Sequence, residues 1–265
     1  MAVLKKQPAK VSLLLLFSLL PIPAAADLLS LAQTDTRLIA EGRVSGQNNP
    51  GTVLLETGVA LHPALIAPQD LTPLLPGLRG RTVRAYGTSP PDRHGRLPVQ
   101  IILSAAPERW WQAETVGAGL ARVWTNDPPD AALTALLAQE DEARRHNRGH
   151  WSRPDWQPVC ADTPDALHTG AFALIQGTIR RASLRQGTLW LDFGADWRTD
   201  TSATLPAPVL KALPKDRRQP AFWTGKTVEI RGWVQGGPRL DLTAAGQIRL
   251  LPAEMPPCRG QPLKN

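Results

Sequence analysis

Residues 91–97 read Pro-Asp-Arg-His-Gly-Arg-Leu, and this stretch decides the fold of the chain. Asp92 can close a turn by side-chain hydrogen bonds, and Gly95 can adopt a backbone conformation that few other residues tolerate. Apolar and polar residues alternate over 81–86 before the turn and over 97–103 after it, which is typical of strands. The stretch therefore predicts two strands joined by a tight turn.

Three more strands are expected before this pair. Each is a short run that either alternates apolar and polar residues or is rich in aliphatic and β-branched residues. These runs cover residues 37–45, 51–56 and 59–61. Strands so closely spaced predict a curved meander.

Two helices are expected after the pair, over 107–118 and 130–147. The longer one has apolar residues at spacings of three and four, a candidate N-cap at Asp130 and Gly149 beyond its end. Five strands followed by helices predict a barrel with helices packed on one end.

Four segments together resemble the second half of the thermonuclease (staphylococcal-nuclease-like) family. They are PDRHGRL at 91–97, GLARV at 119–123, EDEARR at 140–145 and GHWS at 149–152. The resemblance covers about residues 37–156. It implies an oligonucleotide/oligosaccharide-binding (OB) barrel with packed C-terminal helices.

The same resemblance implies a catalytic site, most of which is missing. The family hydrolyses phosphodiesters with one Ca²⁺, two arginines and a glutamate. Arg96 is the retained catalytic position, Gln69 replaces the glutamate and Leu61 the first arginine, while Ile66 and Gly51 replace the metal-binding aspartates. Calcium needs several anionic oxygens, and glutamine cannot accept a proton from water near neutral pH. We therefore expect no metal or cofactor and no complete nuclease site.

Two alternatives stay open at this site. A slip of one or two residues in the alignment would offer Glu56 or Asp70 as substitute carboxylates, each on a different part of the strand or loop. Arg96 also has a structural explanation, because the turn that carries it can maintain the fold without any catalytic role.

A second unit is expected over residues 165–255. Its strands are short runs bounded by proline and glycine, with a helical stretch between the third and the fourth. The expected strands are 173–183, 188–193, 199–205, 226–235 and 239–243 with 247–251, and the helix is 208–213. This is the OB order. The chain is therefore predicted to be mainly β with helices, in the form of two five-stranded OB-type barrels.

Aromatic and basic side chains are interleaved in the second unit. OB barrels bind strands of nucleic acid or sugar, using aromatic residues for stacking and basic residues for the backbone. The turn over 193–200 is rich in charged and aromatic residues. The binding residues that we expect are Trp197, Arg198, Arg180, Arg181 and Arg231. The alternative is that large aromatics such as Trp190 and Trp233 only fill the barrel.

Two other polar motifs are interpreted as helix surface. His146 and His150 are four residues apart, but the predicted helix ends between them and no third zinc ligand is near in the sequence. The acidic run at 140–142 is expected on an exposed helix face, countered by Arg144 and Arg145.

The first 26 residues have the pattern of a secretory signal. Three lysines precede an apolar run over 11–20 and a small-residue site that ends at Ala26. The apolar run is shorter than the ~20 residues that a membrane span needs. We therefore expect cleavage near Ala26, a periplasmic or secreted protein, and no stable membrane insertion. Removing the three lysines lowers the formal net charge from +7 to +4.

The chain has two cysteines, Cys160 and Cys258, near the edges of the predicted second unit. Neither has the spacing of a metal or redox site. An oxidising compartment would allow a bridge between them, and closing so long a loop contributes ~4–5 kcal/mol in the chain-entropy model. A structural disulfide is expected, with two free buried thiols as the alternative.

These patterns together predict an exported, thermonuclease-like protein that is not an active nuclease and that binds single-stranded nucleic acid or another polyanion. One alternative is a weak or metal-altered thermonuclease-type phosphodiesterase that uses Arg96 and a relocated carboxylate. Another is a periplasmic envelope scaffold that binds protein or glycan. No pattern in the sequence indicates an oligomeric state.

Overall fold

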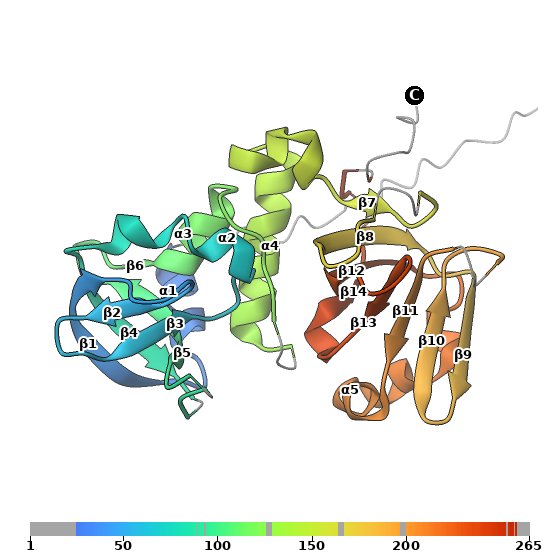
Figure 1. Cartoon of the computed structure of the whole chain (residues 1–265), viewed down its shortest axis with the longest axis horizontal. Helices are drawn as coiled ribbons and strands as arrows, with labels where there is room; N and C mark the ends of the chain where they lie inside the picture. The colour runs from blue at the N-terminus through green and yellow to red at the C-terminus, as the bar shows by residue number, and fades with distance from the viewer. Residues whose placement is uncertain are drawn as a thin grey trace, which may run out of the picture.

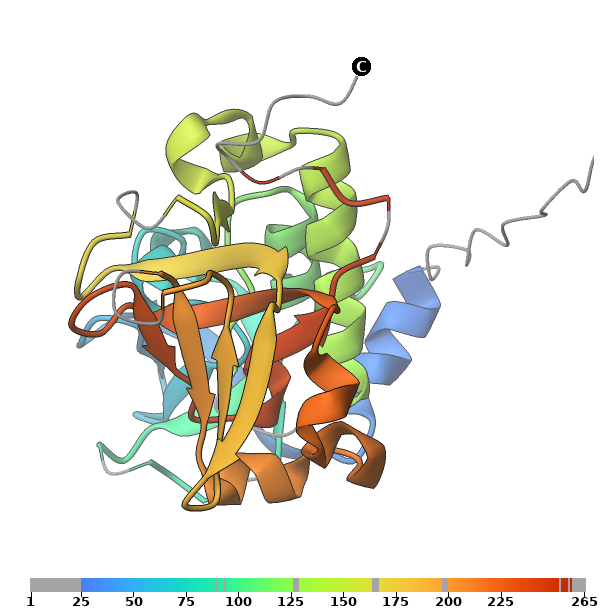
Figure 2. The ribbon, with the colours of Figure 1, turned by 90° about the vertical axis from the view of Figure 1, so that its right-hand side faces the viewer.

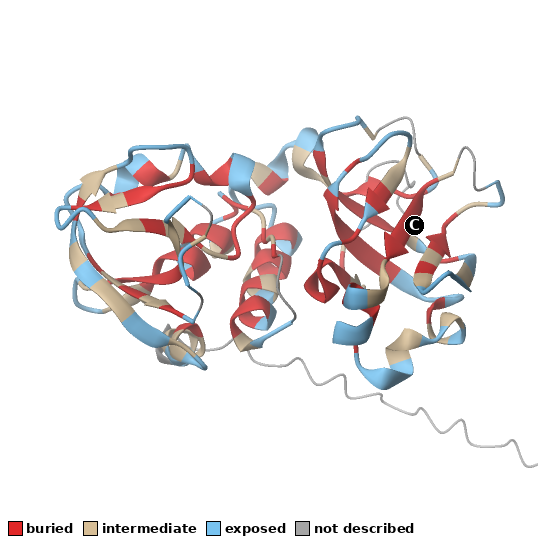
Figure 3. Ribbon diagram, turned by 60° about the horizontal axis from the view of Figure 1, so that its bottom comes forward, coloured by how far each residue is buried: buried red, intermediate tan, exposed pale blue. Residues whose placement is uncertain are grey.

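Two β units lie on either side of helix α4 (Ala131–Arg145) in the computed structural model (Figure 1). The structure describes residues 25–88, 90–92, 94–125, 129–163, 167–196, 200–252, 254–256 and 258. We call residues 25–156 the first unit and residues 159–258 the second unit. Buried residues fill the interior of each unit and continue along α4 (Figure 3).

Five strands of the first unit close into a barrel. They pair in the order β3-β2-β1-β4-β5, and a parallel ladder between β3 and β5 joins the two ends. The strands are β1 (Arg37–Gly46), β2 (Val53–Leu55), β3 (Ala60–Pro63), β4 (Thr82–Gly87) and β5 (Leu97–Leu103), and β6 (Arg109–Trp110) extends β5. The helix α2 (Pro68–Leu71) and the 3-10 helix η1 (Leu75–Leu78) connect the third strand to the fourth. The predicted five-stranded, OB-like barrel is therefore confirmed for this unit.

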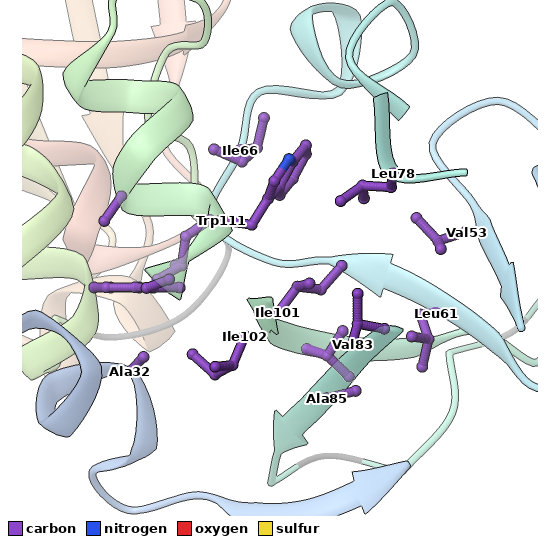
Figure 4. Packing of buried hydrophobic residues seen from close by; sticks show 14 of the residues in the cluster. Ala32, Val53, Leu61, Ile66, Leu78, Val83, Ala85, Ile101, Ile102 and Trp111 are labelled. Carbon is purple, nitrogen blue, oxygen red and sulfur yellow. The ribbon is translucent and has the colours of Figure 1, made fainter. Parts of the chain in front are cut away.

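Apolar side chains fill the barrel because alternate residues of a strand point to the same face. Leu61 of β3, Val83 and Ala85 of β4 and Ile101 of β5 are fully buried and meet in one cluster (Figure 4). The barrel interior is therefore a packed core, and ligands can reach only its outer surface.

Helices α1 (Ala25–Gln33), α3 (Trp111–Gly117) and α4 cover one end of the barrel. The predicted N-cap is present, because the side chain of Asp130 accepts a hydrogen bond from the Leu133 backbone N at 2.6 Å. Helix α1 contains the expected cleavage position at Ala26. Residues 1–24, which make up most of the predicted signal, lie outside the described residues.

Two of the recognised motifs meet where α4 ends, before the 3-10 helices η2 (Gly149–Ser152) and η3 (Pro154–Trp156). The backbone N of His150 donates to the Gly119 carbonyl at 2.9 Å. A Cβ at Gly119 would lie 2.1 Å from the Arg148 carbonyl oxygen, and one at Gly149 would lie 2.5 Å from that of Ala118. Close packing requires glycine at both positions, which accounts for these motif residues without a catalytic role.

The strands of the second unit form two four-stranded sheets, which pair in the orders β13-β11-β10-β9 and β14-β12-β8-β7. The strands are β7 (Val159–Cys160), β8 (Phe172–Thr178), β9 (Arg181–Arg185), β10 (Thr188–Asp192), β11 (Ser202–Leu205), β12 (Thr227–Trp233), β13 (Arg239–Asp241) and β14 (Ile248–Leu250). The helical elements are α5 (Ala207–Ala212), η5 (Lys215–Arg218), α6 (Pro220–Trp223) and η6 (Ala245–Gln247). In Figure 2 the strands β9, β10 and β11 run across β8 and β12.

The ladders of these two sheets do not close into a ring, in contrast to the first unit, so a second barrel is not formed in the strict sense. The sequence predicts a single strand over 173–183, but the chain changes sheet within it. Ile179 N donates to the Lys226 carbonyl at 2.9 Å, whereas Arg180 N donates to the Asp192 carbonyl at 2.9 Å. The predicted strand is therefore divided into β8 and β9, one in each sheet.

The strand pairings of the first unit nevertheless recur in the second. β8 pairs antiparallel with β12 as β1 does with β4, and β11 pairs parallel with β13 as β3 does with β5. A helical segment again lies between the third and fourth positions of this pattern. An isolated antiparallel bridge between Val234 and Leu240 links the two sheets.

Tryptophans occupy different environments in the second unit. Trp223 is buried in its core and donates from Nε1 to the Arg217 carbonyl at 2.7 Å. Trp190 is half-buried, and Trp233 is 37 % exposed with its ring centroid 5.7 Å from that of Phe172. Trp223 is therefore the tryptophan that fills the interior, rather than Trp190 or Trp233.

Cys160 and Cys258 form the expected disulfide, with their Cα atoms 5.0 Å apart. The bridge joins residues 98 apart in sequence and ties the end of the described chain to β7. A structural disulfide indicates an oxidising compartment. Among the residues that the structure describes, no helix is long and apolar enough to cross a membrane.

Candidate functional site

Arg96 directly precedes β5, in a turn that Asp92 closes. The Asp92 carboxylate accepts hydrogen bonds from the backbone N of His94 at 2.8 Å and of Arg96 at 3.0 Å. Gly95 has a φ of 72°, which favours glycine. The turn predicted from the sequence is therefore confirmed, and its hydrogen bonds support the structural explanation for this motif.

The Arg96 guanidinium is held by the same carboxylate. Its Nε and Nη2 atoms both lie 2.8 Å from Asp92 Oδ2, and both side chains are about three-quarters buried. Burial would raise the pKa of Asp92, but the hydrogen bonds from Arg96 and His94 outweigh it and lower that pKa to about 2. The positive charge of Arg96 is therefore largely neutralised within the turn.

His62 lies close to this pair, and our sequence analysis did not select it. It lies on β3, where its backbone is in register with Pro98 of β5, and its Nδ1 is 2.8 Å from the Gly51 carbonyl. Burial lowers the pKa of His62 below its ordinary value of 6.5, and the charge of Arg96 lowers it further, although the bond with Gly51 raises it. The imidazole is therefore neutral at pH 7. The signal that could have identified it is its place in β3, between two inward-facing residues.

The four positions that the family fills with catalytic groups have different surroundings here. Leu61 and Ile66 belong to the barrel core, and Ile66 forms a backbone bridge with Val123. Gly51 is buried, with a φ of 72°. Gln69 is exposed on α2, and the structure does not bring it into contact with Arg96. Within the described parts of the chain, no three His, Cys, Asp or Glu side chains are grouped so that they could hold a metal.

The two substitute carboxylates are engaged elsewhere. Asp70 is buried and receives hydrogen bonds from Arg122, with Nε to Oδ2 at 2.9 Å and Nη2 to Oδ1 at 2.8 Å. The Arg122 guanidinium also lies 4.5 Å from the ring centroid of Trp156. Glu56 is exposed and lies 4.0 Å from Arg43. Neither carboxylate is placed beside Arg96.

The residues expected to bind a ligand in the second unit are dispersed. Arg180 is exposed, and Arg181 is exposed but paired with Asp192 at 2.9 Å. Arg231 is buried, so it is not available at the surface as expected. Trp197 and Arg198 lie outside the described residues.

Arg231 instead lies at the junction of the two units. Its Nη1 donates to the Val123 carbonyl at 2.8 Å, and its Nη2 lies 2.8 Å from Glu140 Oε2 and also contacts Glu229. Glu140 belongs to α4, whereas Arg231 and Glu229 belong to β12. The same Glu140 carboxylate accepts a hydrogen bond from the Val123 backbone at 2.7 Å.

Two further ion pairs complete this junction. Arg144 of α4 lies 2.5 Å from Glu229, and Arg249 of β14 donates to both oxygens of Asp141 at 2.7 and 2.6 Å. We call Glu140, Asp141, Arg144, Glu229, Arg231 and Arg249 the junction network. It holds three acidic and three basic groups. The acidic run of α4 is therefore not an exposed helix face. The second unit covers Glu140 and Asp141, and Glu142 is buried and paired with Arg145 and His146 of the first unit.

Charge compensation keeps Glu229 and Arg231 of the junction network ionised. Burial would raise the pKa of Glu229, but Arg249, Arg144 and Arg231 hold it well below its ordinary range. Burial also acts against the charge on Arg231, but Glu140 and Glu229 hold its pKa above its ordinary range. The network therefore joins the units through paired charges, and Nε and Nη2 of Arg144 are its buried atoms without a hydrogen-bond partner among the described residues.

His146 and His150 do not form a metal pair. Nδ1 of His146 lies 3.0 Å from Glu142, whereas the His150 ring packs on Trp156 with centroids 4.6 Å apart. Helix α4 ends at Arg145 before either histidine. Both therefore make contacts near the end of α4.

A cavity of about 550 Å³ lies beside Arg180. Its lining includes Phe193, Gly194 and Asp200 from the turn that the sequence marked as unusual, and Asp162 from the segment after β7. Residues 197–199 of that turn are outside the described residues. The cavity places Arg180 next to a surface hollow that the described part of this turn borders.

No protein-family model matches the chain, and no curated protein is similar to it. The OB-like barrel of the first unit therefore rests on its own strand order, and the thermonuclease resemblance rests on the motifs alone.

Proposed function

We propose that this chain is an exported, thermonuclease-like protein that has lost phosphodiester cleavage and binds a polyanion. The observation that carries the first half is the pairing of Arg96 with Asp92 at 2.8 Å, at the one catalytic position that the motifs retain. The positions expected to hold calcium carry Ile66 and Gly51, which offer no side-chain oxygen. The residues at these positions therefore support neither calcium-dependent cleavage nor phosphate binding by an unpaired arginine.

The second unit supports the binding half of the proposal. The recurrence of the β1–β4 and β3–β5 pairings in β8–β12 and β11–β13 supports its derivation from an OB barrel. Such barrels bind polyanions with basic and aromatic side chains. Arg180 is exposed there, and Trp197 and Arg198 remain part of the proposal as neighbours of the same turn.

A nuclease assay of the chain without residues 1–26 tests the loss of cleavage. We expect single-stranded DNA, double-stranded DNA and RNA to remain intact with and without added Ca²⁺, at the level of a tag-matched buffer control. The matched variant is Arg96→Ala. Calcium-dependent cleavage that this variant abolishes would overturn the proposal and establish the enzyme.

His62 favours a second candidate, a weak phosphodiesterase that does not use the family's glutamate. Its neutral imidazole can accept a proton near pH 7, and it lies close enough to Arg96 for their charges to interact. Cleavage that His62→Gln abolishes and that persists in a chelator would support this candidate. If the protein neither cleaves nor binds nucleic acid, the envelope scaffold becomes the better proposal.

A further inference from the structure

The segment that connects β11 to β12 in the second unit is rich in basic residues. Residues 206–226 contain five basic side chains and one acidic side chain, Asp216. The basic residues are Lys211, Lys215, Arg217, Arg218 and Lys226. They belong to α5, η5 and the turn after α6, and we call these elements with Lys226 the basic cap.

Among the described residues, the basic cap side chains have no carboxylate partner, in contrast to several other basic residues of the unit. Arg181, Arg239 and Arg249 each form an ion pair with an aspartate. None of the five basic cap residues lies within 4.0 Å of a carboxylate oxygen among the described residues. Charges that are not neutralised in this way create a positive potential that attracts anions.

Contacts with the backbone and with an aromatic ring hold the two arginines of the basic cap in place. Arg218 donates from Nε to the Leu213 carbonyl at 2.8 Å and from Nη2 to the Lys211 carbonyl at 2.6 Å. Arg217 lies against the ring of Phe222, 5.6 Å from its centroid. Groups ordered before a ligand arrives lose less conformational entropy on binding.

Two more arginines adjoin the basic cap. The backbone N of Ile179 donates to the Lys226 carbonyl at 2.9 Å, so the exposed Arg180 follows directly on a residue bonded to the cap. At the other end, a Cβ at Gly187 would lie 3.6 Å from that of Ala207 in α5. The exposed Arg185 at the end of β9 is therefore near α5. The positive surface extends beyond the cap in both directions.

We propose that the basic cap binds the backbone of a single-stranded nucleic acid. The inference rests on the proposed function and names the surface and the ligand. Exposed lysines supply phosphate contacts, while the half-buried Phe222 with Arg217 offers an aromatic and guanidinium surface on which a base can stack. A sulfated glycan or an anionic membrane would use the charges but not this stacking surface.

Charge reversal at two of the exposed lysines, Lys211 and Lys215, tests this surface. A labelled single-stranded oligonucleotide is titrated into the wild type and into Lys211→Glu/Lys215→Glu at several salt concentrations, with fluorescence anisotropy as the readout. Loss of two phosphate contacts should weaken binding about tenfold or more at low salt and reduce the slope of log affinity against log salt by about 1.4. The matched control is Arg37→Glu/Arg79→Glu, which makes the same charge change at exposed positions of the first unit.

Each outcome decides between the proposals. If the wild type binds no oligonucleotide even at low salt, the basic cap has no nucleic-acid role, and if it does not bind heparin either, the proposed function fails as well. If the wild type binds but both variants lose affinity equally, the function stands and the basic cap is not its surface. Tighter binding of heparin than of the oligonucleotide, with no effect of Phe222→Ala on the oligonucleotide, would overturn the ligand class. Thermal unfolding of each variant shows whether it is folded, and Lys226→Gln repeats the test with a milder change.

Discussion

The junction network and the Asp92–Arg96 pair are both built from carboxylates and guanidinium groups, yet their surroundings differ. In the junction network, Arg144, Arg231, Glu140 and Glu229 have side chains that are at most 1 % exposed. In the turn, the side chains of Asp92 and Arg96 are 25 % and 22 % exposed. Water can solvate one set of charges but not the other.

This difference sets what each set of charges does for the protein. Removing one partner from a buried network leaves an uncompensated charge in a medium of low polarity, which is strongly destabilising. A partly solvated pair contributes little, because water replaces the lost partner. The junction network should therefore hold the two units together, whereas the turn pair should contribute little to stability and should adjust the local electrostatics near His62.

The largest effect is expected for Arg231→Met. It leaves Glu140 without its buried ionic partner, and we expect the free energy of unfolding to fall by ~3–5 kcal/mol. Urea denaturation followed by circular dichroism measures it, with Arg239→Met as the control. Arg239 pairs with Asp241 in the same unit, but both side chains are more than 40 % exposed, so its loss should cost ~0–1 kcal/mol.

A double variant, Glu140→Gln/Arg231→Met, sharpens this test. It removes both charges of one pair, so it should recover part of the stability that Arg231→Met loses. Equal losses in Arg231→Met and Arg239→Met would contradict the assignment of the junction network as the main connection between the units.

A smaller loss of unfolding free energy is expected for Asp92→Asn, which keeps an acceptor oxygen for the turn but removes the charge. We expect a loss of ~1 kcal/mol at pH 7. The pKa of Asp92 is lowered to about 2 in the folded state, against ~3.9 for an unfolded chain. Its contribution is therefore present above pH 4 and disappears as the pH falls through the folded value.

The measurement is the difference in unfolding free energy between the wild type and Asp92→Asn from pH 7 down to pH 2. The difference should shrink towards zero at the acid end. It should also shrink in 1 M salt, where the screening length is ~3 Å. A difference that does not change with pH would mean that the amide disturbs the turn itself.

The smallest effect concerns His62. Because burial lowers its pKa in the folded state, the unfolded state takes up the proton first as the pH falls below ~6.5, and the folded state loses some stability there. Titration of the ring by NMR should show protonation below pH 6.5, and Arg96→Gln should raise the pKa by removing a nearby positive charge. Titration above pH 6.5 in the wild type would show that the ring is solvated.

The local features of the fold could be predicted from the sequence. Alternation of apolar and polar residues placed the barrel strands, and the Asp92–Gly95 turn and the Asp130 cap were predicted from side-chain chemistry alone. Such features depend on contacts over a few residues, so the pattern contains their cause. The disulfide followed as well, because only two cysteines were available.

The split of the second unit into two sheets was not predictable in the same way. Residues 173–183 have the composition of one strand, and nothing local marks the point where the chain changes sheet. That point depends on two backbone hydrogen bonds, which Ile179 and Arg180 donate to the carbonyls of Lys226 and Asp192. Register of this kind is set by partners distant in sequence.

The local pattern Glu-Asp-Glu-Ala-Arg-Arg at 140–145 specified a helix with opposite charges one turn apart, and that much was inherent in the residues. Whether Glu140 and Asp141 faced water depended on the second unit. Glu140 meets Arg231 across 91 positions of sequence, and Asp141 meets Arg249 across 108. An exposed and a buried acidic helix face have the same local sequence, because the pairing that permits burial comes from another part of the chain. Tertiary packing therefore turned a predicted surface and a predicted binding arginine into the connection between the two units.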